Sequence, residues 1–307
     1  MWLNCGQTPR WSVAAELLPL PGEPLNYPGR RPAAFQGGSC ATALQGADSR
    51  PRRYSNLGHE SRGYGTLLFA SRDKGLAGGT FHMALIAPSL LAADFARMGE
   101  ALRTIEAAGA PILHVEVMDG HFVEDIGVGQ PVVRRLREAT DLVLDLHLLI
   151  ERPERYVAEF LEEGADRISV HFEATTGLHR VLEQIRKQGV KAGVALNPAT
   201  PVETIVDMVG EFDYLSILSS DPGLNERAFI PRSVEKVRAA ASLRDARRAD
   251  FAIQVEGGIR FEHLEQLTRA GADILVAGSA IFNSEDPKAR LGEMLSVVSE
   301  SQRMRKV

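Results

Sequence analysis

Residues 112–120 read Ile-Leu-His-Val-Glu-Val-Met-Asp-Gly, an apolar run with polar side chains at two alternate positions near its middle. An amphipathic stretch at 95–107 and an Ala-Gly-Ala turn at 108–110 come directly before it. Glycine at the end of a helical stretch is a common way to stop a helix ahead of a strand. The segment therefore predicts a helix followed by a buried strand, which is part of a repeating strand–helix pattern.

The same pattern recurs through residues 83–307. Short apolar runs predict eight strands, at 85–88, 112–118, 142–148, 167–171, 191–196, 214–218, 252–255 and 274–277. Helical stretches lie between them, among them 153–162, 204–209 and 261–270. Eight parallel strands alternating with helices over about 225 residues are typical of a (βα)8 TIM barrel, so we predict a single-domain α/β barrel. An open, doubly wound sheet is the rival, but no glycine-rich fingerprint follows the first strand.

Residues 1–82 have a different character. They contain both tryptophans, both cysteines and 12 of the 28 glycines, and no strand or helix periodicity persists through them. A segment of this kind buries too little apolar surface to offset its ordering entropy. Three interpretations compete: upstream sequence translated ahead of a true start at Met83, a disordered tail, or an organelle-targeting segment. We favour the first and predict that the barrel domain comprises 83–307.

Composition narrows the class of partner. The net charge is −5, which gives no electrostatic footprint for nucleic acid. No apolar run approaches the roughly 18 residues that a membrane span requires. Both cysteines lie within the first 40 residues, so the barrel has none, which fits a reducing compartment. We therefore expect a cytoplasmic protein whose partner is a small molecule.

Polar side chains gather at the ends of three predicted strands. His114 and Glu116 lie two residues apart and so share a strand face, His147 ends the third strand, and Glu256 follows the seventh. A single strand histidine is more often a core residue than a ligand. Four such groups converging on the active end of a barrel are costly to bury without a purpose. Two imidazoles and two carboxylates suit one divalent ion: zinc, iron, manganese or cobalt.

A second feature lies in the last two loops. Gly257-Gly258 follows the seventh strand and Gly278-Ser279 follows the eighth. Barrels commonly seat a phosphate on backbone N–H groups in these two loops. His171 ends the fourth strand without an assigned role, and we expect His263 on a helix surface.

With these residues in place, the chain from Met83 to Phe282 closely resembles the ribulose-phosphate 3-epimerases. The shared motifs are Ile-Ala-Pro-Ser-Leu-Leu-Ala-Ala-Asp-Phe (86–95), Val-Met-Asp-Gly-His-Phe-Val (117–123), Leu-Asp-Leu-His-Leu (144–148), Gly-Val-Ala-Leu-Asn-Pro-Ala-Thr-Pro (193–201), Asp-Pro-Gly (221–223), Phe-Ile-Pro (229–231) and Val-Ala-Gly-Ser-Ala-Ile-Phe (276–282). The resemblance implies a homo-oligomeric, metal-dependent isomerase of the pentose phosphate pathway. It would interconvert D-ribulose 5-phosphate and D-xylulose 5-phosphate by 1,1-proton transfer through an enediolate.

The resemblance also implies a role for each site residue. Glu116 and Glu256 fall on the two acid/base positions, which also bind the metal, and His114 and His147 complete the coordination. The residues that fall on substrate-binding positions are Ser89, His147, Gly223, Gly257, Gly258, Gly278 and Ser279.

Several departures from the family cluster at this end of the barrel. Both acid/base positions carry glutamate where the family has aspartate, so each carboxylate reaches about 1.5 Å further. The loop at 222–227 reads Pro-Gly-Leu-Asn-Glu-Arg and lacks two of the family's glycines, and Glu124-Asp125 replaces a Pro-Asn pair. The alternatives are a paralogue acting on another ketose phosphate and a decayed protein that only binds metal or sugar phosphate. A related barrel lyase is a weaker alternative, because His147 stands where its lysine would be sought.

Overall fold

A computed structural model describes residues 84–223 and 228–305. The predictions for the N-terminal extension, for a start at Met83 and for Leu224–Arg227 of the divergent loop lie outside the described residues. The barrel prediction falls almost wholly within them.

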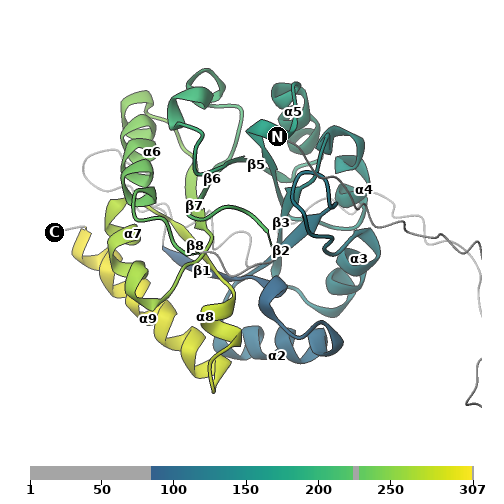
Figure 1. Cartoon of the computed structure of the whole chain (residues 1–307), viewed down its shortest axis with the longest axis vertical. Coiled ribbons are helices and arrows are strands. Elements are labelled where there is room, and N and C mark those ends of the chain that lie inside the picture. The colour runs from purple at the N-terminus through teal and green to yellow at the C-terminus, as the bar shows by residue number, and fades with distance from the viewer. Residues whose placement is uncertain (1–83, 224–227, 306–307) are drawn as a thin grey trace, which may run out of the picture. The chain divides into compact units, whose positions relative to one another are not determined.

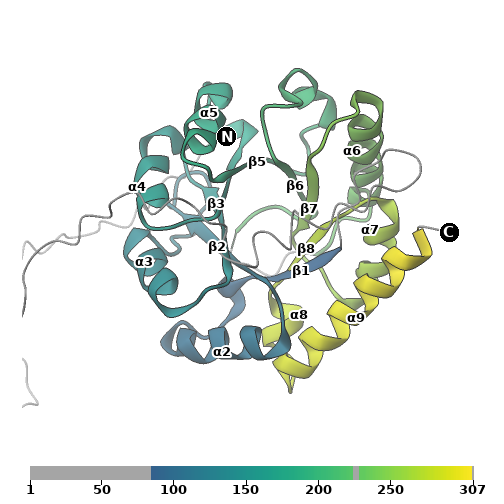
Figure 2. The same cartoon turned by 180° about the vertical axis from the view of Figure 1, so that it is seen from behind.

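Eight parallel strands form one sheet in the order β1-β8-β7-β6-β5-β4-β3-β2. Their bounds are β1 Leu85–Pro88, β2 Ile112–Met118, β3 Val143–Leu149, β4 Arg167–His171, β5 Lys191–Leu196, β6 Tyr214–Leu218, β7 Ala252–Glu256 and β8 Ile274–Ala277. A parallel bridge between Ser89, just after β1, and His114 in β2 brings the two ends of the sheet together. The strands lie at the centre and the helices surround them (Figures 1 and 2). The predicted TIM barrel is confirmed.

Each strand leads into a helical segment on the outside of the barrel. The α-helices are α2 Met98–Ala108, α3 Gln130–Ala139, α4 Val157–Glu162, α5 Leu178–Lys187, α6 Ser233–Arg247, α7 Leu264–Ala270, α8 Ser279–Phe282 and α9 Pro287–Arg305. Short 3-10 helices are η1 Leu90–Ala92, η2 Phe95–Arg97, η3 Pro153–Arg155, η4 Phe172–Ala174, η5 Val202–Met208 and η6 Phe261–His263. The last helix, α9, packs beside α2 (Figure 1), so the two ends of the described chain close the outer ring.

Several predicted elements differ from the structure in detail. The strand predicted at 142–148 is displaced by one residue to Val143–Leu149, and the one at 252–255 extends to include Glu256. The helix predicted at 204–209 is a 3-10 helix, η5, over Val202–Met208. This segment contains Val202, Thr204 and Ile205, whose β-branched side chains lose rotamer freedom in an α-helix.

Most of the core lies between the strands and the surrounding helices. The outward side chains of the strands pack there against apolar helix residues such as Leu182, Val237 and Leu267, all fully buried. A separate apolar cluster, which includes Ala87 and Val276, draws on β1, β2, β3 and β8. The two clusters together give each of these strands buried residues on both faces, as parallel strands require.

Other side chains inside the barrel are polar. Arg167 in β4 lies with its Nε 3.2 Å from Asp145 Oδ1 and donates from Nη2 to Gln254 Oε1 at 2.9 Å. Its guanidinium carbon is 4.0 Å from the ring centroid of Tyr214, whose hydroxyl donates to Asp145 Oδ1 at 3.1 Å. Burial opposes ionisation of Asp145, but Arg167 and His114 hold its pKa below the usual value. Arg167, Asp145, Gln254 and Tyr214 thus contact one another inside the barrel, beneath the carboxyl ends of the strands. We call these four side chains the floor.

Gly193 provides the space for this floor. It pairs with Tyr214 across β5 and β6, and a Cβ atom built on Gly193 would lie 2.3 Å from Cζ of the Tyr214 ring. We expect Gly193→Ala to lower the free energy of unfolding by about 3 kcal/mol, because the ring has to move inside a packed barrel. Equilibrium unfolding in urea measures this loss.

Gly292→Ala in α9 is the control, because nothing lies within 4 Å of its added Cβ. That variant should be neutral or slightly stabilising. The double variant Gly193→Ala/Tyr214→Leu should lose less stability than the two single variants added together, since the clash is then relieved. Equal stability of Gly193→Ala and Gly292→Ala would contradict this account of the floor.

Candidate active site

The carboxyl ends of the strands open into a cavity of about 600 Å³. All but one of the ten predicted site residues line this cavity, namely Ser89, Glu116, His147, Gly223, Glu256, Gly257, Gly258, Gly278 and Ser279. The exception, His114, is fully buried just beneath it. Residues chosen from separate segments of the sequence therefore meet at one place.

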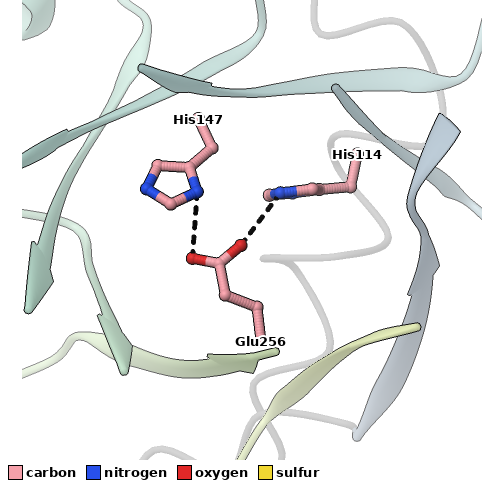
Figure 3. A group of neighbouring side chains, drawn as sticks. All are labelled: His114, His147 and Glu256. Carbon is pink, nitrogen blue, oxygen red and sulfur yellow. Dashed lines mark ion pairs between the residues drawn. The ribbon is translucent and has the colours of Figure 1, made fainter. Parts of the chain in front are cut away.

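Glu256 lies between the two histidines, as Figure 3 shows. Its Oε2 is 2.9 Å from His114 Nε2, and its Oε1 is 3.2 Å from His147 Nδ1. The Ser216 hydroxyl in β6 donates to the same Oε1 at 2.6 Å. Side-chain exposure is at most 6% for the three ionisable groups, so they interact in a medium of low polarity.

Asp145, on the neighbouring strand β3, orients the ring of His114. The His114 Nδ1 lies 2.8 Å from Asp145 Oδ2, and an ionised carboxylate only accepts hydrogen bonds, so Nδ1 carries a proton. Nε2 is thereby directed toward Glu256. Burial by itself would lower the pKa of His114, but Glu256 and Asp145 outweigh it and raise that pKa to about 10. Burial likewise opposes ionisation of Glu256, yet the two histidines hold its pKa well below the usual range.

The geometry of this trio fits a divalent metal ion. His114, His147 and Glu256 each offer one donor atom, and these atoms lie within 4.8 Å of one another. His114 Nε2 and His147 Nδ1 are buried and make no well-formed hydrogen bond, although both lie close to the Glu256 carboxylate. Imidazole nitrogen and carboxylate oxygen are ligands that zinc and neighbouring transition metals prefer. Such a set is the usual core of a metal site.

Glu116 stands apart from this trio. It lines the same cavity, half-buried, but it is not in the group of donors within 4.8 Å of one another. Its Oε1 instead accepts a hydrogen bond from the Ser89 hydroxyl at 2.9 Å. Burial raises the pKa of Glu116, whereas that of Glu256 is lowered. Two carboxylates whose proton affinities are pushed apart are what an acid/base pair needs.

Several polar residues at the site were assigned no role from the sequence. Asp145 and Ser216 hold site residues from inside apolar strands, and His171 in β4 contacts His147 with its Nε2, 2.9 Å from the Nε2 of that ring. Burial lowers the pKa of His171 to about 4. A signal was available for His171 and Glu173, because both come directly at the end of a strand, but a lone strand histidine is weak support for a role.

Glycines also line the cavity. Gly257 has φ of +103° and Gly258 of +64°, conformations that favour glycine. His263, expected on a helix surface, instead lines the cavity and stacks on Phe229 with ring centroids 4.0 Å apart. Glycine backbone and the start of a helix at Ser279 together leave N–H groups available to an anion.

Comparisons with known proteins identify the family. A model of the ribulose-phosphate 3 epimerase family matches residues 85–282. The chain belongs to this family. It is 42% identical to a ribulose-phosphate 3-epimerase of Bacillus subtilis over 213 residues, covering 69% of this chain and 98% of that protein. It is 45% identical to that of Synechocystis over 202 residues, covering 65% of this chain and 88% of the relative.

The fold also resembles more distant barrels. The crystal structure of 3-hexulose-6-phosphate synthase from Salmonella typhimurium superposes with a TM-score of 0.51 at 16% identity, covering 71% of this chain and 98% of that one. At this identity the likeness concerns the barrel alone. Among the residues that the structure describes, no helix combines the length and apolar character needed to cross a membrane.

Gly257 allows a direct test of the glycine loops. An added Cβ would lie 2.4 Å from Ser220 Oγ and 2.8 Å from its backbone nitrogen, so Gly257→Ala forces the loops after β6 and β7 apart. We expect weaker binding of inorganic phosphate and a loss of roughly 1–3 kcal/mol in stability. Calorimetric titration and urea unfolding measure the two effects.

The control is Gly210→Ala. Gly210 has the same φ of +103°, but nothing lies within 4 Å of its added Cβ. Gly210→Ala should lose stability through backbone strain alone, because no neighbouring loop has to move. Its binding of inorganic phosphate should therefore not change. If both variants bind phosphate as the unmodified protein does, the glycine loops are not the anion site.

Proposed function

We propose that this protein is a metal-dependent epimerase that interconverts D-ribulose 5-phosphate and D-xylulose 5-phosphate. The observation that carries the proposal is the opening of two carboxylates, Glu116 and Glu256, into one cavity beside His147. Membership of the epimerase family and the names of the relatives support the same reaction.

Epimerisation beside a ketone removes a proton from one face of the carbon and returns a proton to the other. It therefore needs two groups of opposite protonation state. We assign these roles to Glu116 and Glu256, whose pKa values are shifted in opposite directions. The Ser89 and Ser216 hydroxyls each hold one of the two carboxylates, which limits the freedom of the longer glutamate side chains.

His114, His147 and Glu256 would hold the metal, with Glu116 as the fourth ligand from the protein. When bound, a divalent ion of this kind stabilises negative charge that develops on the substrate oxygens as the proton leaves. Asp145 keeps His114 in the correct orientation, and buried walls limit the access of water to the acid/base pair.

The glycine loops would receive the phosphate. Gly223, Gly257, Gly258, Gly278 and Ser279 line the part of the cavity away from the floor. Binding the phosphate there would orient the sugar with its reacting carbon toward the carboxylates. Family membership also supports a homo-oligomer, and the absence of cysteine from residues 83–307 supports a cytoplasmic location.

Proton exchange tests the reaction directly. The enzyme in deuterated water should exchange the C3 proton of D-ribulose 5-phosphate and form D-xylulose 5-phosphate, followed by proton NMR. Glu116→Gln and Glu256→Gln should each abolish turnover, because an amide can neither accept nor supply the transferred proton. Glu235→Gln, on the exposed surface of α6, is the matched control and should retain full activity.

The outcomes separate the candidate functions. An active Glu256→Gln variant would contradict the assignment of acid/base roles to both Glu116 and Glu256. Exchange confined to a different pentulose or hexulose phosphate would favour a paralogue with another substrate. Metal binding without exchange on any ketose phosphate would favour a decayed binding protein.

Metal removal provides a second test. Chelation should abolish activity, and zinc, manganese, iron or cobalt should restore it. Metal at a hundred times its dissociation constant should raise the free energy of unfolding by about 2.7 kcal/mol. His147→Gln should lose this stabilisation, whereas His179→Gln, whose side chain is 63% exposed on α5, should keep it. Full activity after exhaustive chelation would contradict a metal-dependent reaction.

A further inference from the structure

His147 makes a second contact on the side of its ring away from Glu256. Its Nε2 lies 2.9 Å from Nε2 of His171, which ends β4 and is fully buried. The two ring centroids are 4.9 Å apart and the ring planes differ by 21°. The nitrogen–nitrogen distance is that of an N–H···N hydrogen bond between the two rings.

His171 is in turn fixed by a carboxylate. Its Nδ1 lies 3.1 Å from Glu173 Oε2. The other oxygen of Glu173 accepts hydrogen bonds from the backbone nitrogen of Asn197, at 2.9 Å, and from the Thr200 hydroxyl. The ring of Phe122 covers His171 with centroids 4.6 Å apart, which limits its exposure to water. Each hydrogen-bonding position of His171 therefore has one partner.

These contacts determine where the protons lie. An ionised Glu173 only accepts, so the proton of a neutral His171 resides on Nδ1 and its Nε2 has a lone pair. That lone pair accepts from His147, whose proton must then be on Nε2. The Nδ1 of His147 is left with a free lone pair, directed into the site beside Glu256.

We propose that His171 and Glu173 are positioning residues that hold His147 in the tautomer able to bind metal through Nδ1. The inference rests on the proposed function for the identity of the ligand. It gives the two site histidines separate supports: Asp145 contacts His114 directly, and Glu173 acts on His147 through His171. Partners of this kind fix the orientation and tautomer of metal-binding histidines.

Metal affinity is the first test. Binding of Co²⁺ to the full chain, followed by its visible absorption, should weaken about 10- to 100-fold in His171→Phe, which has no acceptor nitrogen. His171→Gln retains an acceptor oxygen and should recover part of the affinity. Glu173→Gln, at the partly exposed end of the relay, should give an intermediate loss and remain folded.

Val170→Ala is the control for a merely structural effect. Val170 is a fully buried neighbour on β4 that belongs to the outer core, so its truncation should lower stability and leave Co²⁺ affinity unchanged. Unchanged affinity in both His171→Phe and Glu173→Gln would overturn the proposal, and so would an equal loss in Val170→Ala.

The tautomers themselves can be observed without metal. Long-range ¹H–¹⁵N correlation spectra of the metal-free protein, recorded above the ordinary pKa of imidazole, should place the proton on Nε2 of His147 and on Nδ1 of His171. A His147 proton on Nδ1 would overturn the proposal. If the unmodified protein binds no Co²⁺, the proposed metal site fails; if it binds and the variants bind equally, only the positioning role fails.

Discussion

The contacts that Glu256 makes with two buried histidines constrain the side chains around it. Burial removes the Glu256 carboxylate, at the end of β7, from contact with water. This costs several kcal/mol unless nearby charges and hydrogen bonds compensate. His114, His147 and Ser216 provide the compensation from three other strands. The positions of these strands around the barrel are therefore tied to one carboxylate, and small shifts of any strand would leave a buried charge with fewer partners.

From Glu256, contacts between acidic and basic side chains continue inside the barrel. Glu256 contacts His114, His114 contacts Asp145, and Asp145 contacts Arg167. Such a stack is costly to assemble and gives little net stability compared with an apolar interior. Its benefit is orientation, because each group is hydrogen-bonded to a side chain of another strand and loses that hydrogen bond if it rotates.

The sequence predicted best the features that depend on residue types with a single structural interpretation. Apolar runs separated by glycine turns located the strands, and polar residues at their ends located His114, His147 and Glu256. Reasoning failed where a residue is ambiguous: a serine within an apolar strand, such as Ser216, has no signal of its own. Asp145 became significant once the register placed it beside His114, and His171 once its ring was seen to contact His147. Periodicity also could not separate the 3-10 helix η5 from an α-helix in a segment this short.

The closure of the barrel has a consequence for how the protein is made. The first strand pairs with the last, and Ser89 completes the ring by bridging to His114. A chain emerging from the ribosome exposes His114 and His147 early, but Glu256 and β8 are translated near the end. Because distant pairings must wait for the whole domain, a growing chain has His114, Glu116 and His147 but lacks the Glu256 carboxylate that lies between the two histidines. If the site holds a metal as proposed, its complete set of donors exists only in the finished fold, which rather than the nascent chain would select the ion.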